Sequence, residues 1–166
     1  MDACEKQGIP VVVLDRPNPI NCIDEEGPIL DLGYTSFVGL HSIPVRHGKT
    51  IGELARIFKA ERFPSCELYV MEMENYDKRM WFDETGLPWV MPSPNMPTLD
   101  TAIVYPGMCL LEATNVSEGR GTTRPFEIFG APFIDAEKLC RYMNGLKLPG
   151  VLFRENYFQP TFHKGA

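Results

Sequence analysis

A continuous apolar run near the start of the chain, IPVVVLD at residues 9–15, most constrains the fold. Side chains alternate between the two faces of a strand, so a run without polar positions predicts a strand covered on both faces, as in parallel α/β sheets. The following RPNPIN predicts a loop at the carboxyl end of that strand, where open α/β sheets bind ligands. Asp15, Arg16 and Asn18 are therefore candidate ligand contacts. A turn in which Asp15 or Asn18 bonds its own backbone explains them equally well.

Other segments predict helices and strands around this run. The segment before it is typical of the end of a helix that turns at Gly8. HGKTIGELARIFKAE predicts a helix, because Thr50 and Glu53 form a capping box and apolar residues recur at helical spacing. A second strand is expected at residues 66–74. Short strands are also expected at 28–32, 35–40, 126–129, 151–153 and 157–162, and helices at 98–112, interrupted at Pro106-Gly107, and at 136–144, capped by Asp135.

Composition excludes several classes of protein. The chain has 166 residues, which favours one domain, and a formal net charge of -6. Without a Lys/Arg-rich run, nucleic acid is not an expected partner, and no apolar stretch approaches the length of a membrane span. The five cysteines are scattered without a CxxC pair, and the histidines lack ligand spacing, so we predict neither a metal site nor a cofactor. Nothing in the sequence indicates an oligomeric state.

Two polar features have both a functional and a structural explanation. His47 lies just before the capped helix and could contact substrate or act as an acid or base, or it simply bonds nearby backbone. The long loop at residues 75–97 contains WVMPSPNMPT. There Ser93 and Asn95 accompany Trp89, a combination that can hold a sugar by ring stacking and amide hydrogen bonds. A Pro-rich surface crossing with the tryptophan packed inward explains the same residues.

The strongest polar candidate is the run EATNVSEGRGTTRPFE at residues 112–127. Glu112 and Glu118 can each serve as a general acid or base. Arg120 and Arg124 can form bidentate bonds to a carboxylate or phosphate, and the glycines on either side of Arg120 allow sharp turns and close approach of a ligand. The run contains neither the G-x-x-x-x-G-K-[ST] nor the G-x-G-x-x-G fingerprint of phosphate-binding loops. An internally paired Glu–Arg loop would have the same composition.

Several long motifs occur in order and resemble one family. They are DRPNP, SFVGL, IPVRHGKTIGELA, LPWVMPSPNMPT, YPGMCLLEATNVSEGRGTTRPFEIFGAPF and LPGVLFRENYFQPT. Together they are similar to the family first known as DUF1343, which includes exo-β-N-acetylmuramidases of the NamZ type. The resemblance covers nearly the whole chain.

The resemblance implies a bacterial glycoside hydrolase of cell-wall recycling that removes N-acetylmuramic acid from the non-reducing end of peptidoglycan fragments. It implies an α/β fold, with a Rossmann-like domain with a parallel or mixed sheet at residues 1–130 and the start of a smaller α+β portion at 131–166. Arg120 or Arg124 would bind the lactyl carboxylate, and Asn95, Asn115 and Thr122 the hydroxyl and amide groups. Glu118, then Glu112, are the expected catalytic carboxylates, because glycoside cleavage canonically uses two.

The resemblance also implies features outside this sequence. Members are typically exported or cell-envelope proteins, whereas the first residues here lack the layout of a secretory signal. Members begin with a region before the DRPNP strand, so we expect this chain to belong to a longer protein and to be inactive alone if a catalytic carboxylate lies there. The alternatives are a carbohydrate-binding fragment without catalysis, a structural fragment, or a site for a phosphorylated metabolite at the DRPNP loop.

Overall fold

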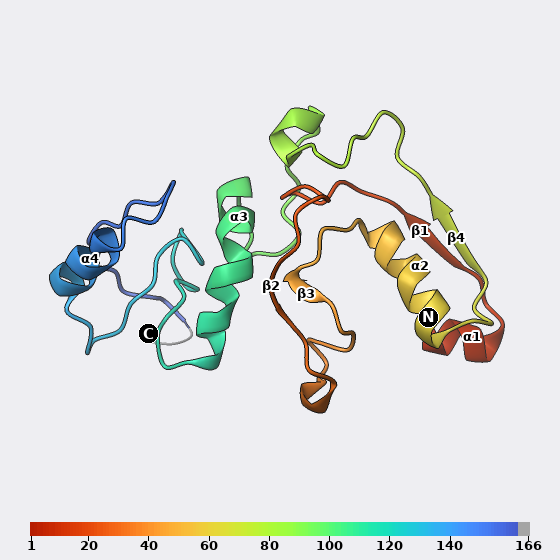
Figure 1. The fold of residues 1–166 in the computed structure, drawn as a ribbon, viewed down its shortest axis with the longest axis horizontal. Coiled ribbons are helices and arrows are strands. Elements are labelled where there is room, and N and C mark those ends of the chain that lie inside the picture. The colour runs from red at the N-terminus through yellow and green to blue at the C-terminus, as the bar shows by residue number, and fades with distance from the viewer. Residues whose placement is uncertain (163–166) are drawn as a thin grey trace. The chain divides into compact units, whose positions relative to one another are not determined.

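The computed structural model describes residues 1–162 and divides the chain into two compact units, Met1–Pro88 and Trp89–Ala166. Figure 1 shows the elements of both units, which we describe separately. The units divide at a different position from the domain boundary expected after residue 130, which stays a prediction. No helix among residues 1–162 is long and apolar enough to cross a membrane.

A pair of parallel strands is the centre of the first unit. The strands β1 (Val11–Leu14) and β4 (Leu68–Met71) pair in register from Val11 with Leu68 to Leu14 with Met71. Helix α2 (Ile51–Arg62) connects them along the chain and lies against both (Figure 1). The short helix α1 (Asp2–Gln7) precedes β1 and ends at Gly8, which has the left-handed φ of 63°. The strands predicted at residues 9–15 and 66–74, the helix after Thr50, the turn at Gly8 and the α/β fold class are confirmed.

The start of α2 is fixed by two carboxylates. The Thr50 hydroxyl accepts a hydrogen bond from the Glu53 amide at 3.2 Å, and the Glu53 carboxylate accepts one from the Thr50 amide at 3.1 Å. Asp15, directly after β1, accepts bonds from the Thr50 hydroxyl and the Gly52 amide, each at 2.8 Å. These bonds satisfy donors that the first turn of a helix leaves unpaired, so they join the end of β1 to the start of α2.

The prediction that the first strand is covered on both faces is wrong for the described unit. Val11 and Val13 are partly buried, whereas Val12 is 58% and Leu14 70% exposed. The reason is that α2 packs on one face only and the sheet has two strands. The composition of the run is typical of a strand covered on both faces, and the described residues cover one of these faces.

A second sheet and a loop complete the first unit. The antiparallel strands β2 (Glu26–Ile29) and β3 (Pro44–Arg46) pair with an irregular register, and the single-turn helix η1 (Leu32–Tyr34) lies between them. The expected strand at 28–32 is therefore shifted towards the N-terminus, and 35–40 contains only the bridge Ser36–Gly39. The loop expected at 75–97 is present and contains the short helix η2 (Phe82–Thr85).

Helices and turns form the second unit. Helix α3 (Leu99–Met108) continues into the 3-10 helix η3 (Cys109–Ala113), and α4 (Ala136–Gly145) follows Asp135, whose carboxylate caps it. The predicted interruption at Pro106 is wrong, since α3 contains this residue in its last turn. Only the single amide hydrogen bond that proline cannot donate is lost there.

The strands predicted at 126–129, 151–153 and 157–162 do not form in the described residues. Phe126 has a φ of 63°, which is incompatible with extended backbone. The amide and carbonyl of Phe153 bond the side chain of Asn144, and the Thr161 amide bonds the Gly121 carbonyl. Backbone groups that a strand would use therefore pair with a side chain and a turn.

The contact between α2 and the sheet predicts the effect of one methyl group. A Cβ at Gly52 would lie 2.6 Å from Val70 Cγ1 and 2.8 Å from the Asp15 carboxylate. We expect Gly52→Ala to lower the free energy of unfolding by about 1–3 kcal/mol, measured by urea denaturation. Gly107→Ala is the control, because a Cβ in α3 there meets nothing within 4 Å. A Gly52→Ala protein as stable as the parent would contradict this packing.

Candidate functional site

The polar run of the second unit folds into a loop held at three points. The Ser117 amide and carbonyl both bond Gly130, at 2.8 and 3.0 Å. The Phe126 amide donates to the Glu118 carbonyl at 2.6 Å, and the Thr161 amide and hydroxyl both donate to the Gly121 carbonyl at 2.9 Å. Segments far apart in sequence therefore fix the backbone on both sides of Arg120.

Two positions in this loop require glycine. Gly119 and Gly121 have φ values of 84° and 82°, which side chains rarely adopt. A Cβ on Gly119 would lie 2.6 Å from the Ile128 carbonyl oxygen, and one on Gly121 would lie 2.6 Å from that of Phe162. The sequence predicted that these glycines allow sharp turns. The close approach that they permit here is by the chain's own backbone.

The Arg120 guanidinium lies between the two predicted catalytic carboxylates. Its Nη2 donates to Glu112 Oε2 at 3.0 Å, and its Nε lies 3.3 Å from Glu118 Oε1. Its face covers the buried ring of Phe126, with 5.0 Å between the guanidinium carbon and the ring centroid. Tyr105 of α3 meets the same ring edge-on at 4.8 Å. Residues predicted separately are thus brought into one cluster, as the Glu–Arg pairing explanation anticipated.

The two carboxylates of this cluster have different access to solvent. The side chain of Glu118 is 3% exposed and that of Glu112 is 39% exposed. Burial, and then the negative charge of Glu112, raise the pKa of Tyr105, which keeps its phenol neutral beside them. Glu112 can meet a molecule from solvent in this arrangement, whereas Glu118 faces the interior.

Sequence reasoning missed a second, partly buried carboxylate, Glu127. Its Oε1 accepts a hydrogen bond from the Thr101 hydroxyl at 2.7 Å, and its Oε2 pairs with Arg124 Nη1 at 2.7 Å. The Thr101 side chain is fully buried. No local signal could have identified the Thr101–Glu127 contact, because 26 residues separate the two partners along the chain.

The remaining candidates of the second unit form local bonds or none. The Thr122 hydroxyl donates to the Gly119 carbonyl at 2.6 Å and so belongs to the turn. Ser93 accepts from the Asn95 amide at 3.3 Å, as in a Ser-initiated turn. Within residues 1–162 the side-chain amides of Asn95 and Asn115 have no hydrogen-bond partner, so both are available to a ligand.

Two of the three candidate residues of the DRPNP loop form hydrogen bonds within the first unit. Asp15 binds the start of α2, as described above. Asn18 Nδ2 donates to the Lys49 carbonyl at 3.1 Å, and its Oδ1 accepts from the Ile20 amide at 3.2 Å. These bonds match the turn explanation. Arg16 is exposed and makes no side-chain hydrogen bond or ion pair in the part of the chain that the structure describes.

His47 also bonds nearby backbone. Its Nδ1 accepts a hydrogen bond from the Lys49 amide at 3.2 Å, which requires the neutral ring. Burial, and then the charge of Lys49, lower the pKa of His47. The structural explanation of this residue therefore has direct support.

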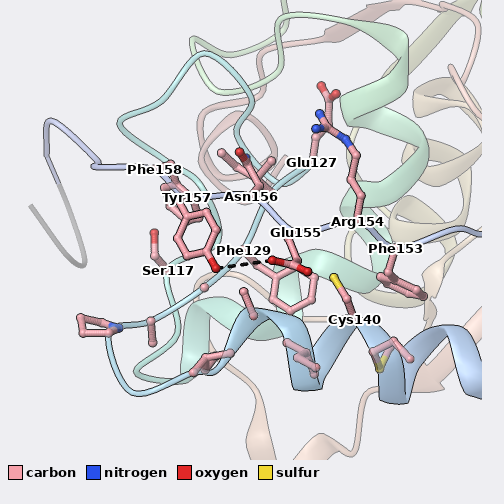
Figure 2. Close-up of a pocket in the computed structure, with 18 of the residues that line it drawn as sticks. Ser117, Glu127, Phe129, Cys140, Phe153, Arg154, Glu155, Asn156, Tyr157 and Phe158 are labelled. Carbon is pink, nitrogen blue, oxygen red and sulfur yellow. Dashed lines mark hydrogen bonds between the residues drawn. The ribbon is translucent and has the colours of Figure 1, made fainter.

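A cavity of about 520 Å³ lies in the second unit between α4 and residues 152–160. In Figure 2 α4 runs along one side, and the side chains of residues 153–158 lie across from it. The Tyr157 hydroxyl donates to Glu155 at 3.4 Å within it. Ser117 and Glu127 line the cavity, but Glu112 and Glu118 do not. Its apolar lining includes Ile128, Phe129, Ile134, Leu139, Met143, Phe153 and Phe158.

Comparisons with family models and with a known protein identify the same family over nearly the whole chain. The family described as "Exo-beta-N-acetylmuramidase NamZ, N-terminal" matches residues 1–100, and its C-terminal counterpart matches residues 103–166. The peptidoglycan beta-N-acetylmuramidase NamZ of Bacillus subtilis (strain 168) is 54% identical over 164 residues, which are 99% of this chain and 40% of that protein. The chain therefore spans less than half the length of this relative.

Two solved structures of DUF1343 family proteins from Bacteroides fragilis NCTC 9343 share the fold. One superposes with a TM-score of 0.90 at 39% identity and covers 99% of this chain but 44% of its own. The other has a TM-score of 0.72 at 42% identity and covers 81% of this chain and 38% of its own.

The environment of His47 predicts a pH dependence of stability. A histidine whose pKa is lowered by folding contributes stability that is complete above its ordinary pKa of about 6.5 and is lost as pH falls below it. We expect His47→Gln to lose less unfolding free energy than the parent between about pH 7 and about pH 5. Urea denaturation at each pH measures this. Equal losses in the two proteins would contradict the assigned neutral, backbone-bonded state.

Proposed function

This chain belongs to the NamZ family of exo-β-N-acetylmuramidases, and we propose that it is part of a glycoside hydrolase acting on peptidoglycan fragments. The reaction would release N-acetylmuramic acid from the non-reducing end. The observation that carries this proposal is the 54% identity with the Bacillus subtilis enzyme across 99% of the chain. The cluster around Arg120 supports it, because one guanidinium pairs with two carboxylates, Glu112 of η3 and Glu118 of the polar loop.

Glu112 is the better candidate for contact with the scissile bond. A general acid or base must come within hydrogen-bond reach of the reacting group, and Glu112 is the more exposed of the two carboxylates. Glu118 would act from the interior by fixing Arg120, which in turn orients Glu112. This order reverses the one expected from the sequence, where Glu118 came first.

Arg124 is the better candidate for the lactyl carboxylate of N-acetylmuramic acid. The guanidinium of Arg120 already meets two carboxylates, whereas Arg124 is 60% exposed and has a single ion pair among the described residues, with Glu127. A bidentate arginine contact would distinguish this acidic sugar from neutral amino sugars. The side chains of Asn95 and Asn115 would bond its acetamido and hydroxyl groups.

The biological setting follows from the same proposal. A muramidase of this kind would act in recycling of the bacterial cell wall, as an exported or cell-envelope protein. The alternative function is carbohydrate binding without catalysis. The side-chain amides of Asn95 and Asn115, which have no hydrogen-bond partner among residues 1–162, are compatible with it, and a muramyl saccharide would then bind without being cleaved.

Hydrolysis can be tested in a chimera in which this chain replaces the 164 matched residues of the Bacillus subtilis relative. We expect the chimera to release chromophore from a chromogenic β-N-acetylmuramide. Glu112→Gln should lower turnover by about 100-fold or more, the usual contribution of general acid–base catalysis. Glu137→Gln on the exposed surface of α4 is the matched control. A folded chimera without turnover would exclude catalysis by this portion, and full turnover in Glu112→Gln would exclude the role of Glu112.

Recognition of the lactyl carboxylate can be measured separately by calorimetric titration of the chimera with N-acetylmuramic acid and N-acetylglucosamine. We expect Arg124→Met to weaken binding of the acidic sugar by about tenfold or more and to leave the neutral sugar unaffected. Arg141→Met is the control, because Arg141 is also an exposed, carboxylate-paired arginine but lies on α4. Equal losses for both sugars would contradict a carboxylate contact.

A further inference from the structure

The carboxylate of Glu127 joins a buried hydroxyl to an exposed arginine in the second unit. Its Oε1 accepts a hydrogen bond from the Thr101 hydroxyl at 2.7 Å, and its Oε2 pairs with Arg124 Nη1 at 2.7 Å. The side chain of Glu127 is 16% exposed, whereas that of Arg124 is 60% exposed. One oxygen of the carboxylate is therefore held from the interior, and the other holds a guanidinium at the surface.

The interior end of these contacts is part of the start of α3. Thr101 lies in the first turn of this helix, and its side chain is fully buried. The hydroxyl of Thr98 accepts a hydrogen bond from the Thr101 amide at 3.3 Å and so caps the helix. The same hydroxyl lies 3.5 Å from Glu127 Oε1. A helix N-terminus attracts negative charge and a buried hydroxyl needs a partner, so both features fix the position of the carboxylate.

The surface end leaves one edge of the Arg124 guanidinium available. A guanidinium has five N–H donors, and a bidentate contact with a carboxylate uses two of them. The ion pair with Glu127 is formed by Nη1, and it is the single ion pair of Arg124 among the described residues. The edge formed by Nε and Nη2 can therefore receive a second carboxylate while Glu127 stays bound.

We propose that Glu127 is a positioning residue for recognition of the acidic sugar. Held by Thr101, it orients Arg124 so that the Nε–Nη2 edge is presented to the lactyl carboxylate of N-acetylmuramic acid. This inference rests on the proposed role of Arg124.

Orientation outweighs the charge that Glu127 neutralises. A long, untethered arginine loses side-chain entropy when a ligand immobilises it, whereas a tethered one has lost much of that entropy on folding. Attraction between exposed charges is weak in water, so the positive charge that Glu127 offsets at Arg124 contributes little affinity by itself. Removal of Glu127 should therefore weaken binding of the acidic sugar and not strengthen it.

The orientation of Arg124 can be measured in this chain without any sugar, by NMR relaxation of its Nε–H group. We expect an order parameter of about 0.8 in the parent and a value below about 0.6 in Glu127→Gln. Glutamine has the same size and still accepts the Thr101 bond, but it cannot form an ion pair with arginine. Thr101→Val should also lower the order parameter, and Thr101→Ser, which keeps the hydroxyl, should preserve it.

Glu137→Gln is the matched control for this measurement. It breaks an ion pair of the same kind, with Arg141 on the surface of α4, and should leave the order parameter of Arg124 unchanged. Circular dichroism of every variant checks that each folds.

The consequence for recognition is measured by calorimetric titration of the chimera with N-acetylmuramic acid and N-acetylglucosamine. We expect Glu127→Gln to weaken binding of the acidic sugar by about three- to tenfold and to leave the neutral sugar unaffected. The double variant Glu127→Gln/Arg124→Met should bind no more weakly than Arg124→Met alone, because Glu127 acts through Arg124. A purely structural role of Glu127 would weaken both sugars and add to the loss from Arg124→Met.

The results separate this inference from the proposed function. If Arg124→Met loses affinity for the acidic sugar but Glu127→Gln binds it as the parent does, or more tightly, positioning is overturned and the role of Arg124 stands. An order parameter that Glu127→Gln leaves unchanged overturns positioning independently of any sugar. If the chimera binds neither sugar, or if Arg124→Met binds both as the parent does, the proposed role of Arg124 fails and this inference fails with it.

Discussion

The second unit depends on the interactions of the Arg120 guanidinium. Its guanidinium meets Glu112 and Glu118 and covers the ring of Phe126, so one side chain joins the polar loop to its small core. A buried carboxylate such as Glu118 is destabilising unless a partner compensates its charge. The glycines on either side of Arg120 let the backbone turn tightly enough to provide that partner. The polar composition of the run is therefore a structural requirement as well as a chemical resource.

Asp15 has the corresponding position in the first unit. It follows a strand and binds the first turn of α2, so it fixes the helix against the carboxyl end of the sheet. The loop that begins there is shaped by such internal bonds. A carboxylate placed as a helix cap has little capacity left for a ligand, which separates Asp15 from the exposed Glu112 although both looked alike as candidates.

The parts of the fold that local signals define were predictable. Helix α2 carries its own capping box, and α4 begins at Asp135 for the same reason. Strands that need a distant partner were less predictable. The segment after α4 has strand-like composition, but Asn144 and Gly121 bond its backbone instead. No sequence pattern predicts that the side chain of Asn144 will bond the backbone of Phe153, nine residues further along the chain.

The sequence by itself determined the family, the capped helices, the central strand and the identity of the charged residues in the polar loop. Only the tertiary structure decided which of these charges face solvent and which pair with each other. It buried Glu118, exposed Glu112, and added Glu127 through a contact with Thr101. The physical reason is that capping and periodicity act over a few residues, whereas burial and ion pairing depend on which distant segments the folded chain brings together.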